Sequence, residues 1–527
     1  MVINHRKETE GRNVSLLSDY FHRLEKSNHF ILGLTGVYFL VLLFAIYHHE
    51  MWRDEMQAWL LARDSSNFFA LFQHMKYEGH PALWHLILMP ITRLSLSPIG
   101  MQVTHLVIAT TTVFLIVKYS PFTLFQKLFF VFGYYPLYEY SVICRNYAIG
   151  LLLVIVLCIL LEQRYKSPML LAATLFLLSH SSVHALILVI GTTLGLGVDY
   201  LLNHQKISSR RIYIGLGLII IGIVTAIIQL NPPSDTGFAV GWYFKFDLER
   251  VYKTLHLVSR AFFPIPNEGI HFWGSELLMK FSWFQKYKLT ISLLIIGVTT
   301  VITLARPSAL LVYISSTTGL LVFFYIKYQG SIRHHGFLFI TFLLIVWGGR
   351  SFKSYFRWPC FFQSYVRTTL NLLLTGLLLM HAVGGLTAVA NDIRYPFSYG
   401  KLTAEFIKAQ KLDQIPIVGD VDFAVSTVVG YLEKESVYYA RGDRKGSFVR
   451  WDNRRTQGVS NQQVLEKAKQ VGIESQSDVL LILNRRLPTE EAIKKHPVEK
   501  LVEFTGSTIG DEGFYLYRYR TILGLSD

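Results

Sequence analysis

The sequence predicts a polytopic α-helical membrane protein, with about eleven spans plus interfacial helices, that ends in a small extramembrane α/β domain. Hydrophobic residues make up 51% of the 527 residues. They gather in runs such as Phe30–Tyr47 and Thr369–Ala390, and about 20 apolar residues are enough to cross a bilayer. We therefore expect a cytoplasmic N-terminal segment at 1–29, a membrane domain at 30–390 and an extracytoplasmic α/β domain at 391–527.

The loops between the apolar segments predict the orientation of the chain. The segments lie at 30–47, 82–97, 102–118, 124–139, 148–162, 168–180, 184–200, 212–230, 289–304, 309–327, 336–348 and 369–390. Loops rich in Lys and Arg favour the cytoplasmic side, and Gly349–Arg367 holds four such residues and no acid. The Arg164/Lys166 turn and the Lys118–Lys127 loop indicate the same side. The outer face then carries Tyr140–Tyr147, Ser179–His184, Asn231–Lys288, Tyr328–His335 and the tail from Asn391.

One of the twelve segments is in surplus if the N-terminus is cytoplasmic. Segment 82–97 is the weakest, because it is short and is interrupted by Pro90 and Arg93. We expect an interfacial or re-entrant helix there, which leaves eleven spans and places all of Tyr47–Gly100 outside. No small-residue cleavage site follows the first span, so we expect no cleavable signal and a multi-pass protein of the plasma (inner) membrane.

The net charge of +15 has two interpretations. A basic chain can be a nucleic-acid binder, but no nucleic-acid motif accompanies the charge here. Cytoplasmic loops rich in Lys and Arg, together with a basic extramembrane domain, explain it better. We therefore expect membrane lipids, and no nucleic acid, among the partners.

Trp52-Arg53-Asp54-Glu55 directly follows the first apolar run. Two adjacent carboxylates are not what membrane insertion favours at a helix exit. On a helix, Asp54 and Glu55 point in different directions, so one can face a cavity while the other is solvated. Trp52, Met56, Trp59 and Leu60 would form an apolar stripe on the membrane surface. The alternative to a proton-removing site is a solvated interfacial helix without function.

Three further groups of polar residues are expected at the same face. Gly79-His80-Pro81 forms a turn, in which His80 is either a cap or a contact of the acid pair. Arg145 and Tyr147 follow at the next outer loop, and an arginine against a span needs a partner such as Glu139 or an anionic ligand. Arg333 and His334 open the eleventh apolar segment. Adjacent histidines diverge on a helix, so His334 and His335 make a poor metal site.

Arg-Asp-Glu after one span, followed by Gly79-His80-Pro81-Ala82-Leu83-Trp84, resembles the GT-C glycosyltransferases. The resemblance is closest to the protein O-mannosyltransferases and lipid A aminoarabinose transferases. That branch often has a second proline where this chain has Ala82. In architecture the resemblance covers about residues 30–390, although its motifs are confined to 52–84, 138–147 and, weakly, 333–336.

This resemblance implies an inverting transfer of a sugar from a polyprenyl-phosphate donor to a hydroxyl of a lipid, glycan or protein. Asp54 would be the general base, with Glu55 as the neighbouring alternative. Arg145 and Arg333 would hold the departing phosphate, with supporting contacts from His80, Tyr147 and His334. The chain lacks a clear Asp-x-Asp motif, which favours a mechanism without a divalent metal or other cofactor.

Two other functions fit parts of the sequence. A transporter or flippase of lipid-linked saccharides would carry charges along its spans and would show inverted repeats. Here the charges gather at one face, and no repeat is visible. A non-catalytic assembly protein, in which the tail is the functional part, would tolerate the loss of Asp54.

The tail predicts an alternation of helices and strands without a glycine-rich phosphate loop. We expect helices at Leu402–Gln410, Phe423–Leu432 and Asn461–Val471. Strands are expected at Ile415–Val418, Ser436–Ala440, Asp478–Leu483 and Phe514–Tyr519. The aromatic and basic segment Ser447–Asp452 is a candidate for acceptor recognition, although a plain core or surface role is the favoured interpretation.

Overall fold

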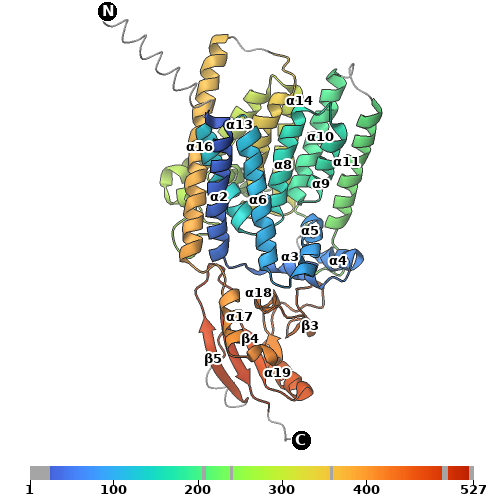
Figure 1. Cartoon of the computed structure of the whole chain (residues 1–527), viewed down its shortest axis with the longest axis vertical. Coiled ribbons are helices and arrows are strands. Elements are labelled where there is room, and N and C mark those ends of the chain that lie inside the picture. The colour runs from blue at the N-terminus through green and yellow to red at the C-terminus, as the bar shows by residue number, and fades with distance from the viewer. Residues whose placement is uncertain (1–23, 204–208, 238–240, 357–359, 489–495, 522–527) are drawn as a thin grey trace, which may run out of the picture.

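The computed structural model describes residues 24–203, 209–237, 241–356, 360–488 and 496–521. Long helices form one bundle, and a smaller domain that contains the β-strands lies beyond one end of it (Figure 1). Most of the expected N-terminal segment, residues 1–23, falls outside the described residues. The prediction of a helical membrane protein with a small C-terminal sheet is confirmed.

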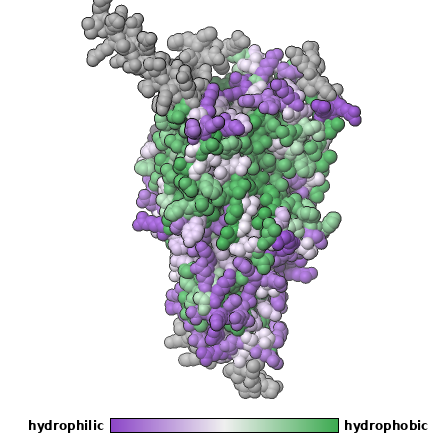
Figure 2. Space-filling view, in the orientation of Figure 1, coloured by the Kyte–Doolittle hydropathy of each residue, from purple (hydrophilic) through white to green (hydrophobic). Residues whose placement is uncertain are grey.

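Eight of the described helices are long and apolar enough to cross a membrane. They are α2 (Asn28–His48), α6 (Ile99–Tyr119), α10 (Val183–Asn203), α11 (Ser209–Leu230), α13 (Ser282–Thr303), α14 (Pro307–Ile326), α15 (Ile332–Trp347) and α16 (Cys360–Arg394). On the face shown in Figure 2, apolar side chains cover this part of the molecule between two more hydrophilic ends. Three more apolar helices are shorter, namely α5 (Leu83–Leu94), α8 (Tyr147–Glu162) and α9 (Pro168–Ser179). The number of spans therefore stays a prediction.

The predicted segment 124–139 is not one helix. It consists of α7 (Leu124–Val131) and the wider π-helix η2 (Tyr134–Val142). Pro136 has no backbone N–H and cannot continue an α-helical ladder. At Gly133 a Cβ atom would lie 2.9 Å from the carbonyl oxygen of Phe130, so the break between the two helices is tight. The wider helix brings a run of buried tyrosines into the bundle.

Side chains from separate loops meet at the end of the bundle that is remote from the tail. Arg164 pairs with Asp199 at 2.7 Å and donates to the carbonyl oxygen of Ser351 at 3.0 Å. Arg164 and Ser351 belong to two loops that the charge pattern places on one face of the membrane. The structure agrees that these two loops lie together.

The tail domain is built on a six-stranded sheet of order β3-β2-β1-β4-β6-β5. Its strands are β1 (Ile417–Gly419), β2 (Val437–Tyr439), β3 (Arg444–Gly446), β4 (Val479–Leu483), β5 (Val498–Phe504) and β6 (Phe514–Tyr519), and its helices are α17 (Gly400–Ala409), α18 (Asp422–Tyr431) and α19 (Asn461–Ser475). The parallel pairs β1–β2 and β1–β4 form its centre. All seven predicted tail elements are present. The short strand β3 and the edge strand β5 were not predicted.

The segment between α2 and α5 lies at the tail end of the bundle. It folds into α3 (Arg53–Asp64), α4 (Phe68–His74) and the one-turn η1 (Met75–Tyr77) before α5, and α3 to α5 lie next to the tail domain (Figure 1). The apolar stripe of α3 was expected on the membrane surface, and this prediction is wrong. Its four side chains are buried, because α5 and α18 pack against α3.

Another helix, α12 (Leu248–Phe262), was not predicted. It lies within the segment 231–288, which was predicted to be a long outer loop.

Candidate active site

Asp54 lies in the first turn of α3 and receives two guanidinium groups on one carboxylate oxygen. Nη1 of Arg145 lies 3.0 Å from Oδ2, and Nη2 of Arg333 lies 3.1 Å from the same atom. Burial alone would raise the pKa of Asp54, but the positive charges of Arg145 and Arg333 outweigh it and hold the pKa below its usual value. The side chain remains 28% exposed. Asp54 is thus an ionised, accessible carboxylate.

The two arginines come from segments that the sequence separates widely. Arg145 lies in the turn between η2 and α8, where it also donates to the backbone carbonyl of Asp54 at 2.8 Å. Arg333 lies in the first turn of α15, with its guanidinium 5.4 Å from the ring of Trp52 and 5.5 Å from the ring of Trp273. Cation–π contacts of this kind favour a fixed guanidinium position.

Glu139 is not the partner of Arg145, contrary to one expectation from the sequence. Its Oε2 accepts hydrogen bonds from the hydroxyl of Tyr134 at 2.8 Å and from the indole N–H of Trp273 at 3.1 Å. Glu139 therefore holds Trp273, which in turn lies against Arg333. The carboxylate that pairs with Arg145 is Asp54.

Several buried polar atoms around Asp54 have no hydrogen-bond partner. They are Nε and Nη1 of Arg333, Nδ1 of His80 and the hydroxyl oxygen of Tyr147. Buried polar groups in folded proteins are nearly always hydrogen-bonded. All three residues were predicted as site residues, and their unused groups are of the type that donates to an oxygen-rich anion.

His80 positions Arg145. It follows Gly79, whose φ of +64° suits glycine, and its Nε2 accepts a hydrogen bond from Nη2 of Arg145 at 3.2 Å. Removal of the imidazole from water, followed by the charge of Arg145, holds the pKa of His80 well below its usual value. His80 is therefore neutral, with Nε2 as the acceptor and Nδ1 free to donate to a ligand.

A cavity of about 350 Å³ opens next to His80. Its polar lining includes Lys76, Gln229 and Asn231, and its apolar lining includes Phe72 and Ile228. Gln229 and Ile228 come from the end of α11, one of the membrane-length helices. The cavity thus joins the apolar exterior of the bundle to one side of the site.

Glu55 is neither solvated nor accessible, which corrects the expectation that the second acid faces water. Its side chain is 0% exposed. Oε2 accepts from the backbone N–H of Trp52 at 3.1 Å and contacts Nε2 of His49 at 3.0 Å, while Oε1 accepts from the N–H of Cys144 at 2.5 Å. Glu55 therefore connects the start of α3 to the residue that precedes Arg145.

His49 and Asp392 belong to the same network, and sequence reasoning missed both. Nδ1 of His49 lies 2.8 Å from Oδ2 of Asp392 in α16. Burial alone would lower the pKa of His49, but Asp392 and Glu55 outweigh it and raise the pKa, so the ring is an imidazolium between two carboxylates. Their position in the sequence was the available signal, because each residue lies at the end of an apolar run, at the face predicted to be outside.

The remaining predicted contact, His334, lies beside the site without touching Asp54. Its Nδ1 accepts from the backbone N–H of Ser331 at 2.8 Å and so caps α15. Its ring meets the edge of the Tyr147 ring at a centroid distance of 5.7 Å. His334 thus supports the ring that carries the unpartnered hydroxyl.

The tail domain contacts α3 directly. Oε1 of Glu512 accepts from the backbone N–H of Arg53 at 2.9 Å. Gln57 exchanges two hydrogen bonds with the backbone of Val449, at 2.8 and 2.9 Å. The segment Ser447–Asp452, a sequence candidate for acceptor recognition, therefore docks on the helix that carries Asp54.

One prediction from the sequence, that the chain lacks a clear Asp-x-Asp motif, needs correction. Asp420-Val421-Asp422 does have the Asp-x-Asp spacing, but it lies in the tail, where Arg455 binds Asp422 at 2.7 Å and Arg485 lies 2.9 Å from Asp420. Across the residues that the structure describes, no group of three or more His, Cys, Asp or Glu side chains is arranged to hold a metal ion.

No protein-family model matches the chain, and no curated protein sequence matches it. The function is therefore argued from the geometry of the site.

Proposed function

We propose that the protein is an inverting glycosyltransferase, which moves a sugar from a polyprenyl-phosphate donor to an acceptor hydroxyl at the outer face of the plasma (inner) membrane. The observation that supports this most is the set of unpartnered donors around Asp54. Arg333, His80 and Tyr147 offer buried donor groups next to an accessible carboxylate. A phosphate needs such donors, and an acceptor hydroxyl needs such a base.

At the anomeric carbon, the proposed reaction forms one C–O bond and breaks another. The acceptor oxygen attacks the anomeric carbon while its proton passes to the carboxylate of Asp54. The bond between the anomeric carbon and the phosphate oxygen breaks, and its electron pair stays on the polyprenyl phosphate. Arg145 and Arg333 stabilise the charge that develops on that leaving group. Attack from the side opposite the phosphate inverts the anomeric centre.

The donor phosphate would also change the basicity of Asp54. In the free protein both guanidiniums contact Oδ2 of Asp54, which keeps the pKa of this carboxyl low. A bound phosphate would compete for the same guanidiniums and weaken these contacts. The pKa of Asp54 would then rise when the donor is in place, which makes it a better base at the moment it is needed.

The other predicted residues take supporting roles in this proposal. His80 fixes Arg145 and donates through Nδ1, the hydroxyl of Tyr147 donates to the phosphate, and His334 supports Tyr147. Both carboxylate oxygens of Glu55 are occupied by protein donors, so we assign the base to Asp54 alone. Glu55 positions Asp54 relative to Arg145.

Substitution of Asp54 tests the proposal. In membranes that contain the full chain and a polyprenyl-phosphate sugar, Asp54→Asn should lower transfer about 10²- to 10⁴-fold. Asp443→Asn is the control, because Asp443 is an exposed residue of the tail that pairs with Lys467 of α19 and has no contact with α3. Equal transfer by Asp54→Asn and the unsubstituted chain would contradict the proposal. Unchanged movement of the lipid-linked sugar across the membrane, with no transfer in any variant, would favour the transporter alternative.

A further inference from the structure

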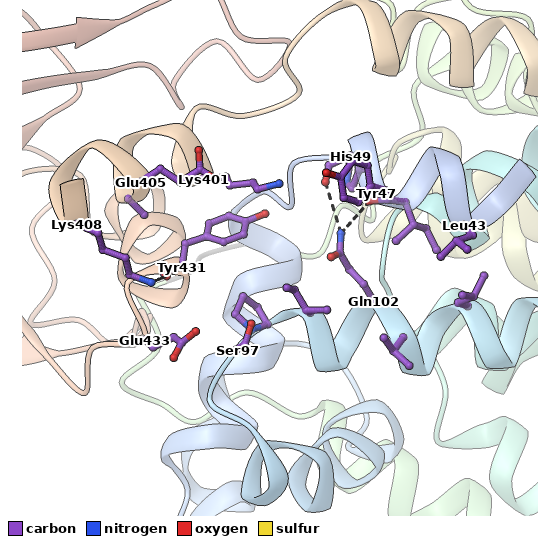
Figure 3. Close-up of a pocket in the computed structure, with 16 residues that line it drawn as sticks. Leu43, Tyr47, His49, Ser97, Gln102, Lys401, Glu405, Lys408, Tyr431 and Glu433 are labelled. Atoms are coloured by element: carbon purple, nitrogen blue, oxygen red, sulfur yellow. Dashed lines mark hydrogen bonds between the residues drawn. The ribbon is translucent and has the colours of Figure 1, made fainter. Parts of the chain in front are cut away.

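A second cavity lies between the membrane helices and the tail domain. It measures about 340 Å³. One wall consists of side chains of α2 and α6, and the opposite wall consists of side chains of α17 and of the end of α18 (Figure 3). Since α2 and α6 are both long enough to cross a membrane and end here, the cavity lies at the level of phospholipid headgroups.

The wall on the bundle side is apolar and faces outward. Leu43 and Tyr47 of α2 are 43% and 75% exposed, and Ile99 and Val103 of α6 are 60% and 54% exposed. Such exposure of large apolar side chains is unfavourable in water but matches the hydrocarbon of a membrane. A lipid chain can therefore lie along α2 and α6 on the membrane side of the cavity.

The wall on the tail side is charged. It offers two ammonium groups, from Lys401 and Lys408, and two carboxylates, from Glu405 and Glu433. Lys401 and Tyr431 extend from the tail toward the end of α2 (Figure 3), and Lys408 donates to the carbonyl oxygen of Tyr431 at 2.9 Å. Charges of both signs, in equal number, complement a headgroup that also carries one charge of each sign.

This cavity is separate from the candidate active site. His49 lines it, but behind His49 lies Glu55, whose side chain is fully buried. A molecule in this cavity therefore does not reach Asp54. It does lie close to the base of α3, because the hydroxyl of Tyr431 accepts the backbone N–H of Met51 at 2.8 Å.

We propose that the cavity binds one zwitterionic glycerophospholipid whose headgroup carries a primary ammonium. Its phosphate accepts from Lys401 and from the hydroxyl of Tyr431, and its ammonium donates to Glu405 and Glu433. Its acyl chains lie on the exposed side chains of α2 and α6. The bound lipid joins the tail domain to the membrane domain at the point where α3 begins.

Lipid binding to the purified full chain in detergent micelles tests this inference. Short-chain phosphatidylethanolamine, phosphatidylcholine and phosphatidylglycerol are added separately, and binding is measured by native mass spectrometry. Phosphatidylethanolamine should bind most tightly, because only its headgroup offers both a phosphate and a primary ammonium. Lys401→Ala should weaken its binding about tenfold, as expected for a lost hydrogen bond to a charged group. Lys469→Ala, an exposed residue of α19 outside the cavity, should leave it unchanged.

A second variant separates headgroup recognition from a general loss of structure. Glu405→Gln should reduce the preference for phosphatidylethanolamine over phosphatidylglycerol, while total lipid binding and the thermal unfolding temperature stay close to those of the unsubstituted chain. Equal binding of the three lipids by the unsubstituted chain would overturn the proposal. An unaltered lipid preference in both Lys401→Ala and Glu405→Gln would overturn it as well.

Discussion

At the scale of single residues, the candidate site centres on Asp54, Arg145 and Arg333. The two arginines differ in which of their nitrogen atoms are still without a hydrogen-bond partner. Arg145 uses its terminal nitrogens on Asp54 and His80, whereas Arg333 has two buried nitrogens without a partner. We therefore assign most of the direct phosphate contact to Arg333, and to Arg145 a larger share in holding Asp54.

Arg333→Lys should raise the KM for the polyprenyl-phosphate sugar and should also lower kcat, because Arg333 contacts the phosphate both before and during transfer. Lysine keeps the charge but loses the planar arrangement of donors that suits phosphate. We expect an increase of about tenfold or more in KM, which corresponds to the loss of one charge-assisted hydrogen bond. Initial rates at varied donor concentration measure it. The control is Arg454→Lys at an exposed tail position, and equal KM values for the two variants would argue against the assignment.

The sequence predicted the members of this site better than their roles. Asp54, His80, Arg145 and Arg333 each lie near the end of an apolar run, at the face predicted to be outside, and their residue types indicate acid and anion chemistry. The role of Glu55 was not predictable, because it depends on Cys144 and on the His49–Asp392 pair, and the latter residues are 343 positions apart. Contacts between residues so far apart cannot be predicted from the local sequence.

Helix α3 is the element that organises the site. Its first turn carries Asp54, and its start is held by Glu55 from within and by Glu512 from the tail. The contact between Glu55 and the N–H of Cys144 ties this start to the turn that carries Arg145. Loss of the Glu55 contact or of the Glu512 contact should therefore move Asp54 relative to the two arginines.

Glu55→Gln should destabilise the protein and should lower transfer far less than Asp54→Asn does, because the base itself is still present. The amide can still accept from Trp52 or Cys144 but leaves the buried imidazolium of His49 with one carboxylate. Loss of one partner of a buried charge costs about 3–5 kcal/mol. Thermal unfolding in detergent should show a lower midpoint, and hydrogen exchange at the first turn of α3 should be faster. An unchanged midpoint with abolished transfer would instead favour Glu55 as a base.

Prediction at the scale of elements succeeded where a pattern was local. Strand β4 was predicted to within one residue, and the capped start of helix α19 was predicted at its observed residue. Strand β5 was missed because Glu499, Lys500 and Glu503 interrupt its apolar pattern, as is usual at an exposed sheet edge. The π-helix η2 was missed because its wide turn depends on packing around Gly133 rather than on periodicity.

At the scale of the whole molecule, the tail and the first outer loop lie at one end of the bundle (Figure 1). This arrangement predicts a common side of the membrane for the two. A cysteine at Ser97 and one at Lys469 should both react with a membrane-impermeant thiol reagent added outside, whereas a cysteine at Ser354 should react only after the membrane is opened. The unsubstituted chain gives the background. Protection of the Ser97 position alone would mean that segment 82–97 crosses the membrane.

The junction between tail and α3 should weaken as pH rises. Burial raises the pKa of Glu512 to about 8, so the folded protein holds a proton that the unfolded chain releases above its usual value near 4.5. Stability from this group is full below about pH 4.5 and is lost as pH rises toward about 8, by about 5 kcal/mol at about 1.4 kcal/mol per pKa unit. Glu512→Gln keeps an acceptor for Arg53 and should remove this part of the pH dependence. This pH dependence is measured by thermal unfolding of both proteins between about pH 5 and pH 8.5, roughly the range between the two pKa values of Glu512. Identical pH profiles for the two proteins would refute the account of this junction.

The central claim is that Asp54 serves sugar transfer from a lipid phosphate. The most direct measurement is the release of polyprenyl phosphate from a polyprenyl-phosphate sugar by the purified full chain in lipid vesicles, with Asp54→Asn and Asp443→Asn beside it. We predict acceptor-dependent release by the unsubstituted chain and by Asp443→Asn, and a release about 10²- to 10⁴-fold slower by Asp54→Asn. Equal release by all three proteins would contradict the claim.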